Sequence, residues 1–208
     1  MTGINELRAH DFFNVVALST LVTMNAGYLV QATEMNKIGT DQIGNDHDHT
    51  AVSVLGTFAV YLIIDIIWIV LVPKCVASSP VAILIHHIAC LVLLAIPFVE
   101  RQFMWHLSIC LLVEINTLFL TLRRNLQQST SLQVVCNAMF YISWILLRLV
   151  MLPILVVFFY FEYVRYSSSI RTFYNIAALG VMGTAFITAM SFKWTLDMLW
   201  KRQTNKKK

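Results

Sequence analysis

Apolar runs of about 20 residues recur along this sequence, and they limit its fold more than any other feature. A helix needs about 20 mainly apolar residues to cross the hydrocarbon core of a bilayer, where its backbone polar groups must bond within the segment. Six candidate spans lie at about 12–31, 51–72, 80–98, 103–122, 132–160 and 173–199. The sequence therefore predicts an all-α integral membrane protein of about six transmembrane helices.

The composition excludes an ordinary water-soluble domain. Of the 208 residues, 58% are hydrophobic and 12% are charged, whereas soluble domains average about 45–50% and about 25%. The mean hydropathy is +0.71. No GxSxG, HExxH, P-loop or GxGxxG motif is present, so we expect no bound cofactor.

Charge at the two ends indicates the topology. Lys and Arg are enriched on the cytosolic side of membrane proteins; nine of them fall on the side that holds both termini and four on the other. We therefore predict a cytosolic N-terminus (1–11), one transmembrane domain (12–200) and a basic cytosolic tail (201–208). The net charge of +4 reflects this tail, so we expect no nucleic-acid partner.

Ionisable residues inside the spans are the best candidates for function. They are Asp65, His86, His87, Glu114, Arg148 and Lys193. A charge at membrane depth is costly unless it faces the bundle interior and finds a partner. At about 1.5 Å per helical residue, Asp65, the His pair and Glu114 all lie roughly 10 Å inside the cytosolic face. Three spans should thus bring polar groups to one depth.

Polar residues at helical spacing extend this pattern. Tyr61, Asp65 and Trp68 share a face of one span, and Glu114 and Thr117 share a face of another. Further stripes hold Asn137, Tyr141, Trp144 and Arg148, then Thr184, Thr188, Ser191 and Thr195. Turned inward, such stripes would line a central lipid-accessible cavity that opens to the cytosol; alternatively, they only join the helices together. Pro153 marks the expected kink in the long fifth span.

Metal chemistry fits this sequence poorly. Membrane di-iron enzymes need about eight histidines in HxxxH and HxxHH boxes, but only six are present, and Ile83 stands where HxxHH needs a histidine. The alternating acidic and histidine residues at 46–49 fit a solvated loop better than a metal site. The four cysteines have no CxxC spacing. We predict no metal site.

The order of the charged motifs resembles a known family. Tyr61 to Asp65, His86-His87, Glu114 to Arg123, Arg148 and Lys193-Trp194 occur in the order of the TLC domain, the TRAM, Lag and CLN homology family of multispan endoplasmic-reticulum proteins. The resemblance covers about residues 12–200. It implies six or more helices around a lipid-accessible cavity, and an endoplasmic-reticulum location.

Two branches of that family imply different functions. Ceramide synthases pair the double histidine with an HDxxD motif, the proposed catalytic set for acyl transfer from acyl-CoA to a sphingoid amine. Here the corresponding residues are Val113-Glu114-Ile115-Asn116-Thr117. The segment from Glu114 to Arg123 is closer to the small TLC-domain-containing proteins, which are linked to membrane phospholipid composition.

These observations leave three hypotheses. In the first, His86 or His87 is the general base for acyl transfer to a lipid amine or hydroxyl, Glu114 or Asp65 orients it, and acyl-CoA is a co-substrate. The candidate substrate-binding residues are Tyr61, Thr117, Tyr141, Arg148, Lys193 and Trp194. In the second, the same groups bind a lipid without reacting and regulate membrane composition. A transporter is favoured less, because no inverted repeat is visible. Membrane lipids are the expected partners, and the protein could form a homodimer.

Overall fold

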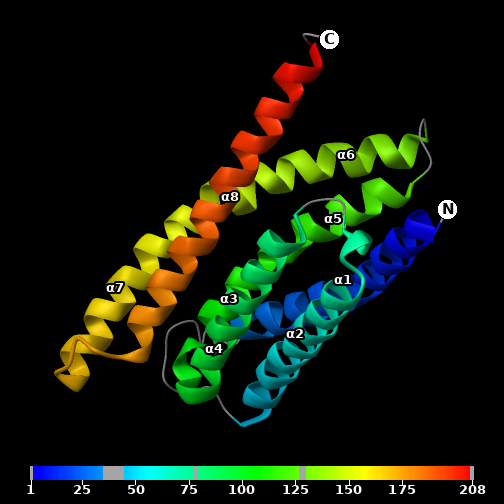
Figure 1. Cartoon of the computed structure of the whole chain (residues 1–208). Coiled ribbons are helices and arrows are strands. Elements are labelled where there is room, and N and C mark those ends of the chain that lie inside the picture. Colours follow the sequence, from blue (N-terminus) through cyan, green and yellow to red (C-terminus); the bar gives the residue numbers. More distant parts are fainter. Residues whose placement is uncertain (1, 35–44, 77–78, 127–129, 207–208) are drawn as a thin grey trace. The chain divides into compact units, whose positions relative to one another are not determined.

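A computed structural model describes residues 2–34, 45–76, 79–126 and 130–206. Every regular element in those ranges is helical (Figure 1). The elements are α1 (Thr2–Glu34), α2 (Asn45–Leu71), η1 (Pro73–Cys75), α3 (Pro80–Val99), η2 (Arg101–Phe103), α4 (Met104–Cys110), η3 (Leu111–Val113), α5 (Glu114–Asn125), α6 (Ser131–Ser143), η4 (Trp144–Met151), α7 (Leu152–Ile170) and α8 (Ile176–Lys206).

Six helical stretches in the described part of the chain are long and apolar enough to cross a membrane. They are Glu6–Thr33, His49–Leu71, Pro80–Val99, Arg101–Asn125, Ser131–Ile170 and Ile176–Trp200. The predicted all-α membrane protein with about six spans is therefore confirmed. Large apolar side chains such as Ile63, Val81 and Val135 are exposed, as expected where the surrounding solvent is lipid.

The first helix starts earlier than the apolar run that predicted it. Hydropathy put the span at 12–31, but α1 begins at Thr2. His10 and Asp11 are helical and only 3% and 2% exposed. Hydropathy excluded both residues because it scores a side chain without its partners, which here lie on other helices.

The helices form two compact units, Met1–Ser143 and Trp144–Lys208. In the first unit, α1 packs against α2 and α5, α2 against α3, and α5 against α6. Leu18, Tyr28, Leu62 and Phe140 are among its fully buried side chains. In the second unit, α7 runs beside α8 (Figure 1).

The long fifth span changes its helical geometry close to the proline that was expected to kink it. Residues Trp144–Met151 form a π-helix, η4, and Pro153 lies in the first turn of α7. A proline has no N–H and its ring crowds the preceding turn. Wider π-type hydrogen bonding before it is one way to accommodate this.

Candidate functional site

Asp65 is the centre of a buried polar cluster in the first unit. Its side chain lies on α2 and is 3% exposed. The Oδ1 atom is 2.6 Å from Nε2 of His10 on α1, and the Oδ2 atom is 3.2 Å from Nδ1 of His87 on α3. One carboxylate therefore contacts two imidazoles that come from two other helices, at a depth where a lone carboxylate would be very costly.

Tyr61 and Asn14 complete this cluster. The Tyr61 hydroxyl donates a hydrogen bond to Oδ1 of Asn14 at 2.9 Å, and Nδ2 of Asn14 lies 3.2 Å from Nδ1 of His10. The helical spacing of four residues puts Tyr61 beside Asp65, and it puts His10 beside Asn14. We call His10, Asn14, Tyr61, Asp65 and His87 the Asp65 cluster.

Aromatic rings surround the Asp65 cluster. Trp68 meets the His10 ring edge-on, with centroids 5.6 Å apart, and Phe13 lies 5.4 Å from Trp68 and 6.0 Å from Tyr61. The Tyr61 ring in turn meets His87 at 6.5 Å. Such walls keep water away from the carboxylate, which strengthens its interactions with the imidazoles.

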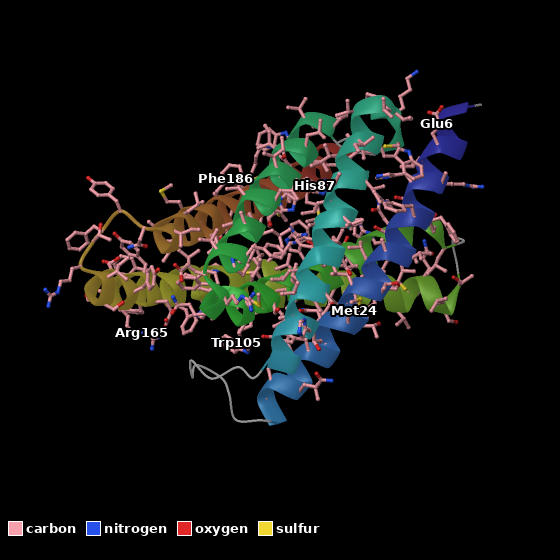
Figure 2. The ribbon with its side chains drawn as sticks, turned by 90° about the horizontal axis from the view of Figure 1, so that it is seen from below. Glu6, Met24, His87, Trp105, Arg165 and Phe186 are labelled. Carbon is pink, nitrogen blue, oxygen red and sulfur yellow. The ribbon has the colours of Figure 1, made fainter. Side chains whose placement is uncertain are left out.

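The two histidines of α3 have different neighbours. Both are 9% exposed, and their rings lie 5.6 Å apart. His87 faces Asp65, whereas Nε2 of His86 lies 3.8 Å from the Cys90 thiol one turn along the same helix. Of the two, His87 has the carboxylate neighbour that orients an imidazole base; Figure 2 labels it on α3.

The sequence model of the TLC domain matches residues 11–200. The chain belongs to the TLC domain family. No curated protein matches the chain, and no solved structure does. Membership in this family, together with six membrane-spanning helices, fits a membrane protein with a lipid-related function.

In this TLC domain, Glu114 is the first residue of α5, directly after the 3-10 turn η3. Its side chain is half-buried. Thr117 is also half-buried, and its carbonyl accepts a hydrogen bond from Thr121. Between them, Asn116 donates to the Phe140 carbonyl and to Ser143, each at 3.0 Å. The segment that replaces HDxxD thus ties α5 to α6.

The other sequence-predicted binding residues lie away from Asp65 or in the second unit. Tyr141, on α6, is 36% exposed, with the Arg123 guanidinium 5.7 Å from its ring. In the second unit, Arg148 is 5% exposed and lies 5.2 Å from the Trp144 ring and 5.7 Å from the Trp194 ring. These contacts bring Arg148 and Trp194 together.

Lys193 does not join that group. Its ammonium pairs with Asp197 at 2.7 Å, and its side chain is 67% exposed. This is a surface pair one helical turn apart, which contributes little to stability.

Sequence reasoning missed His10, Asn14, Asp11 and Arg124. Arg124, near the end of α5, donates a 2.6 Å hydrogen bond to Asp11, whose side chain is 3% exposed. A charged residue next to a histidine, with an asparagine one turn later, could have indicated an inward polar face on the first helix. The hydropathy window at 12–31 left out His10 and Asp11, and this hid the signal.

Three hydroxyls of the threonine and serine stripe of α8 donate to their own helix, and one of them, Thr195, also accepts a hydrogen bond from Trp144 of η4. Thr188 donates to the Thr184 carbonyl at 2.8 Å, Ser191 to Ile187 at 3.0 Å and Thr195 to Ser191 at 2.8 Å. Back-bonding of this kind needs no ligand and no partner helix. It supports a structural interpretation of this stripe.

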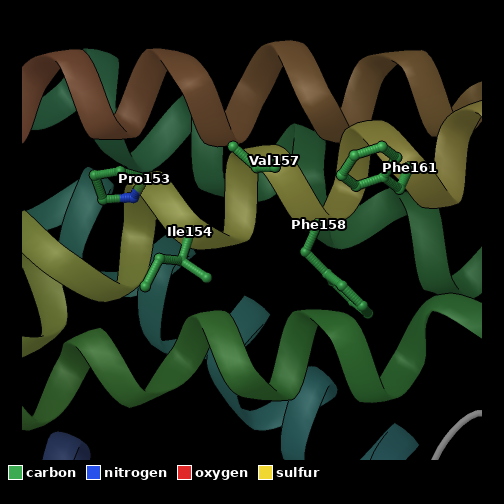
Figure 3. A pocket seen from close by; sticks show the side chains of 5 residues that line it. All are labelled: Pro153, Ile154, Val157, Phe158 and Phe161. Carbon is green, nitrogen blue, oxygen red and sulfur yellow. The ribbon is translucent and has the colours of Figure 1, made fainter.

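An apolar hollow of about 480 Å³ lies along α7 (Figure 3). Its lining side chains are Pro153, Ile154, Val157, Phe158 and Phe161. These side chains are purely hydrocarbon and bring no titratable group. The hollow suits an acyl chain but offers no chemistry.

Among the described residues, no group of three or more His, Cys, Asp or Glu has the geometry of a metal site. In the run at 46–49, residues 46–48 lie outside the part of the chain whose side chains the structure describes.

Cys75, in the turn between α2 and α3, is fully buried. Burial, with the added effect of the negative charge of Asp65, raises the pKa of the Cys75 thiol from 9.0 to about 11. A thiol with so high a pKa stays protonated and is a poor nucleophile at neutral pH.

Proposed function

We propose that this TLC domain modifies membrane lipids by acyl transfer, with His87 as the general base and Asp65 as the residue that orients it. The observation that supports this is the 3.2 Å contact between His87 Nδ1 and Asp65 Oδ2. The two atoms are within ion-pair distance, although Nδ1 of His87 makes no hydrogen bond among the described residues. With Nδ1–H turned onto this carboxylate, Nε2 of the same ring is left to accept a proton.

The reaction would run in two steps. Nε2 of His87 takes the proton of a lipid amine or hydroxyl while that nitrogen or oxygen attacks the carbonyl carbon of an acyl thioester. The tetrahedral intermediate then collapses: the carbon–sulfur bond breaks, and the thiolate leaves with the proton from His87. The products are an acylated lipid and free CoA, and Asp65 stabilises the imidazolium formed between the two steps.

In the first unit, the proposal assigns substrate binding to Tyr61, Thr117 and Tyr141. In the second unit, it assigns substrate binding separately to Arg148, Lys193 and Trp194. Arg148 has the chemistry for an anionic headgroup or a CoA phosphate, because a guanidinium binds such groups through paired hydrogen bonds. We further propose an endoplasmic-reticulum membrane and cytosolic termini, so that acyl-CoA reaches the site from the cytosol.

The test is untargeted lipid mass spectrometry on cells that produce equal amounts of each variant. His87→Ala should abolish the rise of one acyl-lipid class that the wild type causes. His106→Ala is the matched control: it removes an α4 histidine that packs against Phe103 and Trp105, and the acyl-lipid class should still rise. Because His86 faces Cys90, His86→Ala should reduce the product less than His87→Ala does. Equal lipid profiles for wild type and His87→Ala would contradict acyl transfer.

A second candidate is a lipid-binding regulator that does no chemistry. The replacement of HDxxD by Val113 to Thr117 favours it, because one acidic residue and the histidine of that motif are missing. Such a protein would co-purify with one lipid class, lose that lipid on Asp65→Asn substitution, and release no CoA from an acyl-CoA. The same lipid mass spectrometry, applied to the purified protein, separates the two functions.

A further inference from the structure

We propose that His10 of α1 is a positioning residue for the His87 base, and that it acts by fixing the place and orientation of the Asp65 carboxylate. This inference rests on the proposed function, but its central observation is separate from it. The shorter of the two contacts of Asp65 is the one with His10, at 2.6 Å, rather than the one with His87 of α3, at 3.2 Å.

The bonding around His10 determines which of its nitrogens carries the proton. The Tyr61 hydroxyl donates to Oδ1 of Asn14, so the amide nitrogen of Asn14 is turned toward His10. That nitrogen is a donor, and it lies 3.2 Å from Nδ1 and 3.4 Å from Nε2 of His10. The proposal takes the nearer atom, Nδ1, as its acceptor. The single proton of a neutral imidazole then lies on Nε2, where it is donated to Asp65.

A neutral donor has a specific consequence for the base. It fixes the position of the Asp65 carboxylate without neutralising its charge, so the full negative charge stays available to the imidazolium that forms on His87. A doubly protonated His10 would instead compete with His87 for that charge. In such a state the Asn14 amide would also have to turn round, and the donation by Tyr61 would be lost.

The charged neighbour of His10 on α1 has a partner of its own. Asp11, its neighbour on α1, pairs with Arg124 of α5 at 2.6 Å. Trp68 closes the remaining side of the His10 ring with its edge. The path Tyr61, Asn14, His10, Asp65, His87 is therefore a directed series of contacts across three helices, and it ends at the proposed base.

The test combines nitrogen NMR with the lipid measurement, so that the proposal does not depend on activity alone. Protein labelled with ¹⁵N-histidine, in phosphatidylcholine nanodiscs, should show an unprotonated Nδ1 and a protonated Nε2 for His10. His10→Ala should shift the His87 imidazole signals, and His10→Gln should return them most of the way, because its side-chain amide can also donate to Asp65. Asn14→Ala should alter the His10 signals without removing any contact of Asp65.

The lipid readout should follow the same order. His10→Ala is expected to lower product formation by up to about 100-fold, the effect of misplacing a reactive group by about 1 Å, and His10→Gln should restore most of it. His106→Gln, the matched control, should change neither readout.

Two results would overturn the role of His10. In the first, the His87 imidazole signals are the same in His10→Ala as in the wild type. In the second, His10→Ala lowers product formation no more than His106→Ala does. A wild type with no product at all would instead overturn the proposed acyl transfer, and the NMR result alone would then decide whether His10 controls the Asp65–His87 pair.

Discussion

The two units of this TLC domain differ in how they satisfy several of their buried polar groups. In Met1–Ser143, buried polar side chains bond to other helices: Asp65 to α1 and α3, Asn25 to the Ser108 carbonyl of α4, and Asn116 to α6. In Trp144–Lys208, the buried hydroxyls of α8 bond to their own backbone. Bonds of the first kind specify which helices are neighbours, whereas bonds of the second kind do not. Polar residues of the first unit should therefore control both stability and assembly.

The largest expected effect on stability comes from removal of the Asp65 side chain. Asp65→Ala should lower the free energy of unfolding by about 3–5 kcal/mol, the cost of breaking a buried pair. Asp65→Asn keeps the shape and should cost less. Denaturant titration of both variants in mixed micelles measures the difference. A midpoint for Asp65→Ala that coincides with the wild type would mean that the cluster does not hold the three helices together.

The next effect concerns the link between α1 and α5. Arg124→Ala leaves the buried Asp11 carboxylate without its guanidinium, and it should cost about 2 kcal/mol, the typical value for a hydrogen bond to a charged group. Asp11→Ala should cost less, because Arg124 is 32% exposed and can reach water. A double-mutant cycle in the same assay gives the coupling energy. Additive costs would show that the ion pair contributes nothing beyond its parts.

A direct comparison of the units uses one polar residue from each. Asn116→Leu removes two interhelical hydrogen bonds and should cost about 2 kcal/mol. Thr188→Val, which is close to isosteric, removes only a bond to its own helix and should cost less than about 0.6 kcal/mol, the average for polar contacts in a membrane bundle. Equal melting temperatures for the two variants would remove the distinction between the units.

The second unit also has a hydrogen bond between helices, from Trp144 to Thr195, and its strength can be compared with that of the Asp65 cluster. Nε1 of Trp144 donates to Thr195 at 3.0 Å and joins η4 to α8. Trp144→Phe keeps an aromatic ring near Arg148 and removes this bond, whose loss is expected to cost about 1 kcal/mol. Thermal unfolding followed by circular dichroism measures it. A cost as large as that of Asp65→Ala would make this bond as important as the cluster.

The smallest expected effect concerns the ionisation and reactivity of the Cys75 thiol. Because the pKa of Cys75 is raised to about 11, its thiol stays protonated in the folded state as pH rises from 9, where an unfolded thiol would ionise. Stability linked to this group is thus present below pH 9 and is lost between pH 9 and 11. Maleimide labelling of folded protein, read by peptide mass spectrometry, should leave Cys75 unmodified at pH 7–9 and modify it after denaturation. Rapid labelling of the folded form would contradict its burial.

The number of spans and the inward face of α2 could be predicted from the sequence, because both follow from local patterns. Apolar runs give the spans, and a spacing of four gives Tyr61 and Asp65 one face. The choice between His86 and His87 could not be predicted in this way. Adjacent helical residues point about 100° apart, so which one meets Asp65 depends on how α3 is rotated against α2.

The contribution of His10 was invisible for a different reason. Its partner Asp65 lies 55 residues away, and only the packing of α1 against α2 brings them together. The π-helix was unpredictable as well. Pro153 indicates where a regular helix fails, but the hydrogen-bond pattern that replaces it depends on neighbouring side chains such as Trp144 and Arg148.

The order of His10, Asn14 and Asp65 along the chain also bears on how this protein is made. Insertion of an aspartate at the centre of a helix costs about 2.5–3.5 kcal/mol when the segment enters the bilayer alone. Helix α1 leaves the ribosome before α2, so the imidazole and amide that bind Asp65 and Tyr61 are already in the membrane when α2 arrives. His87 follows one span later. We expect α1 to act as an insertion partner for α2. A chain that ends before α3 and carries a spacer long enough for α2 to leave the ribosome should integrate α2 less efficiently when it carries His10→Ala.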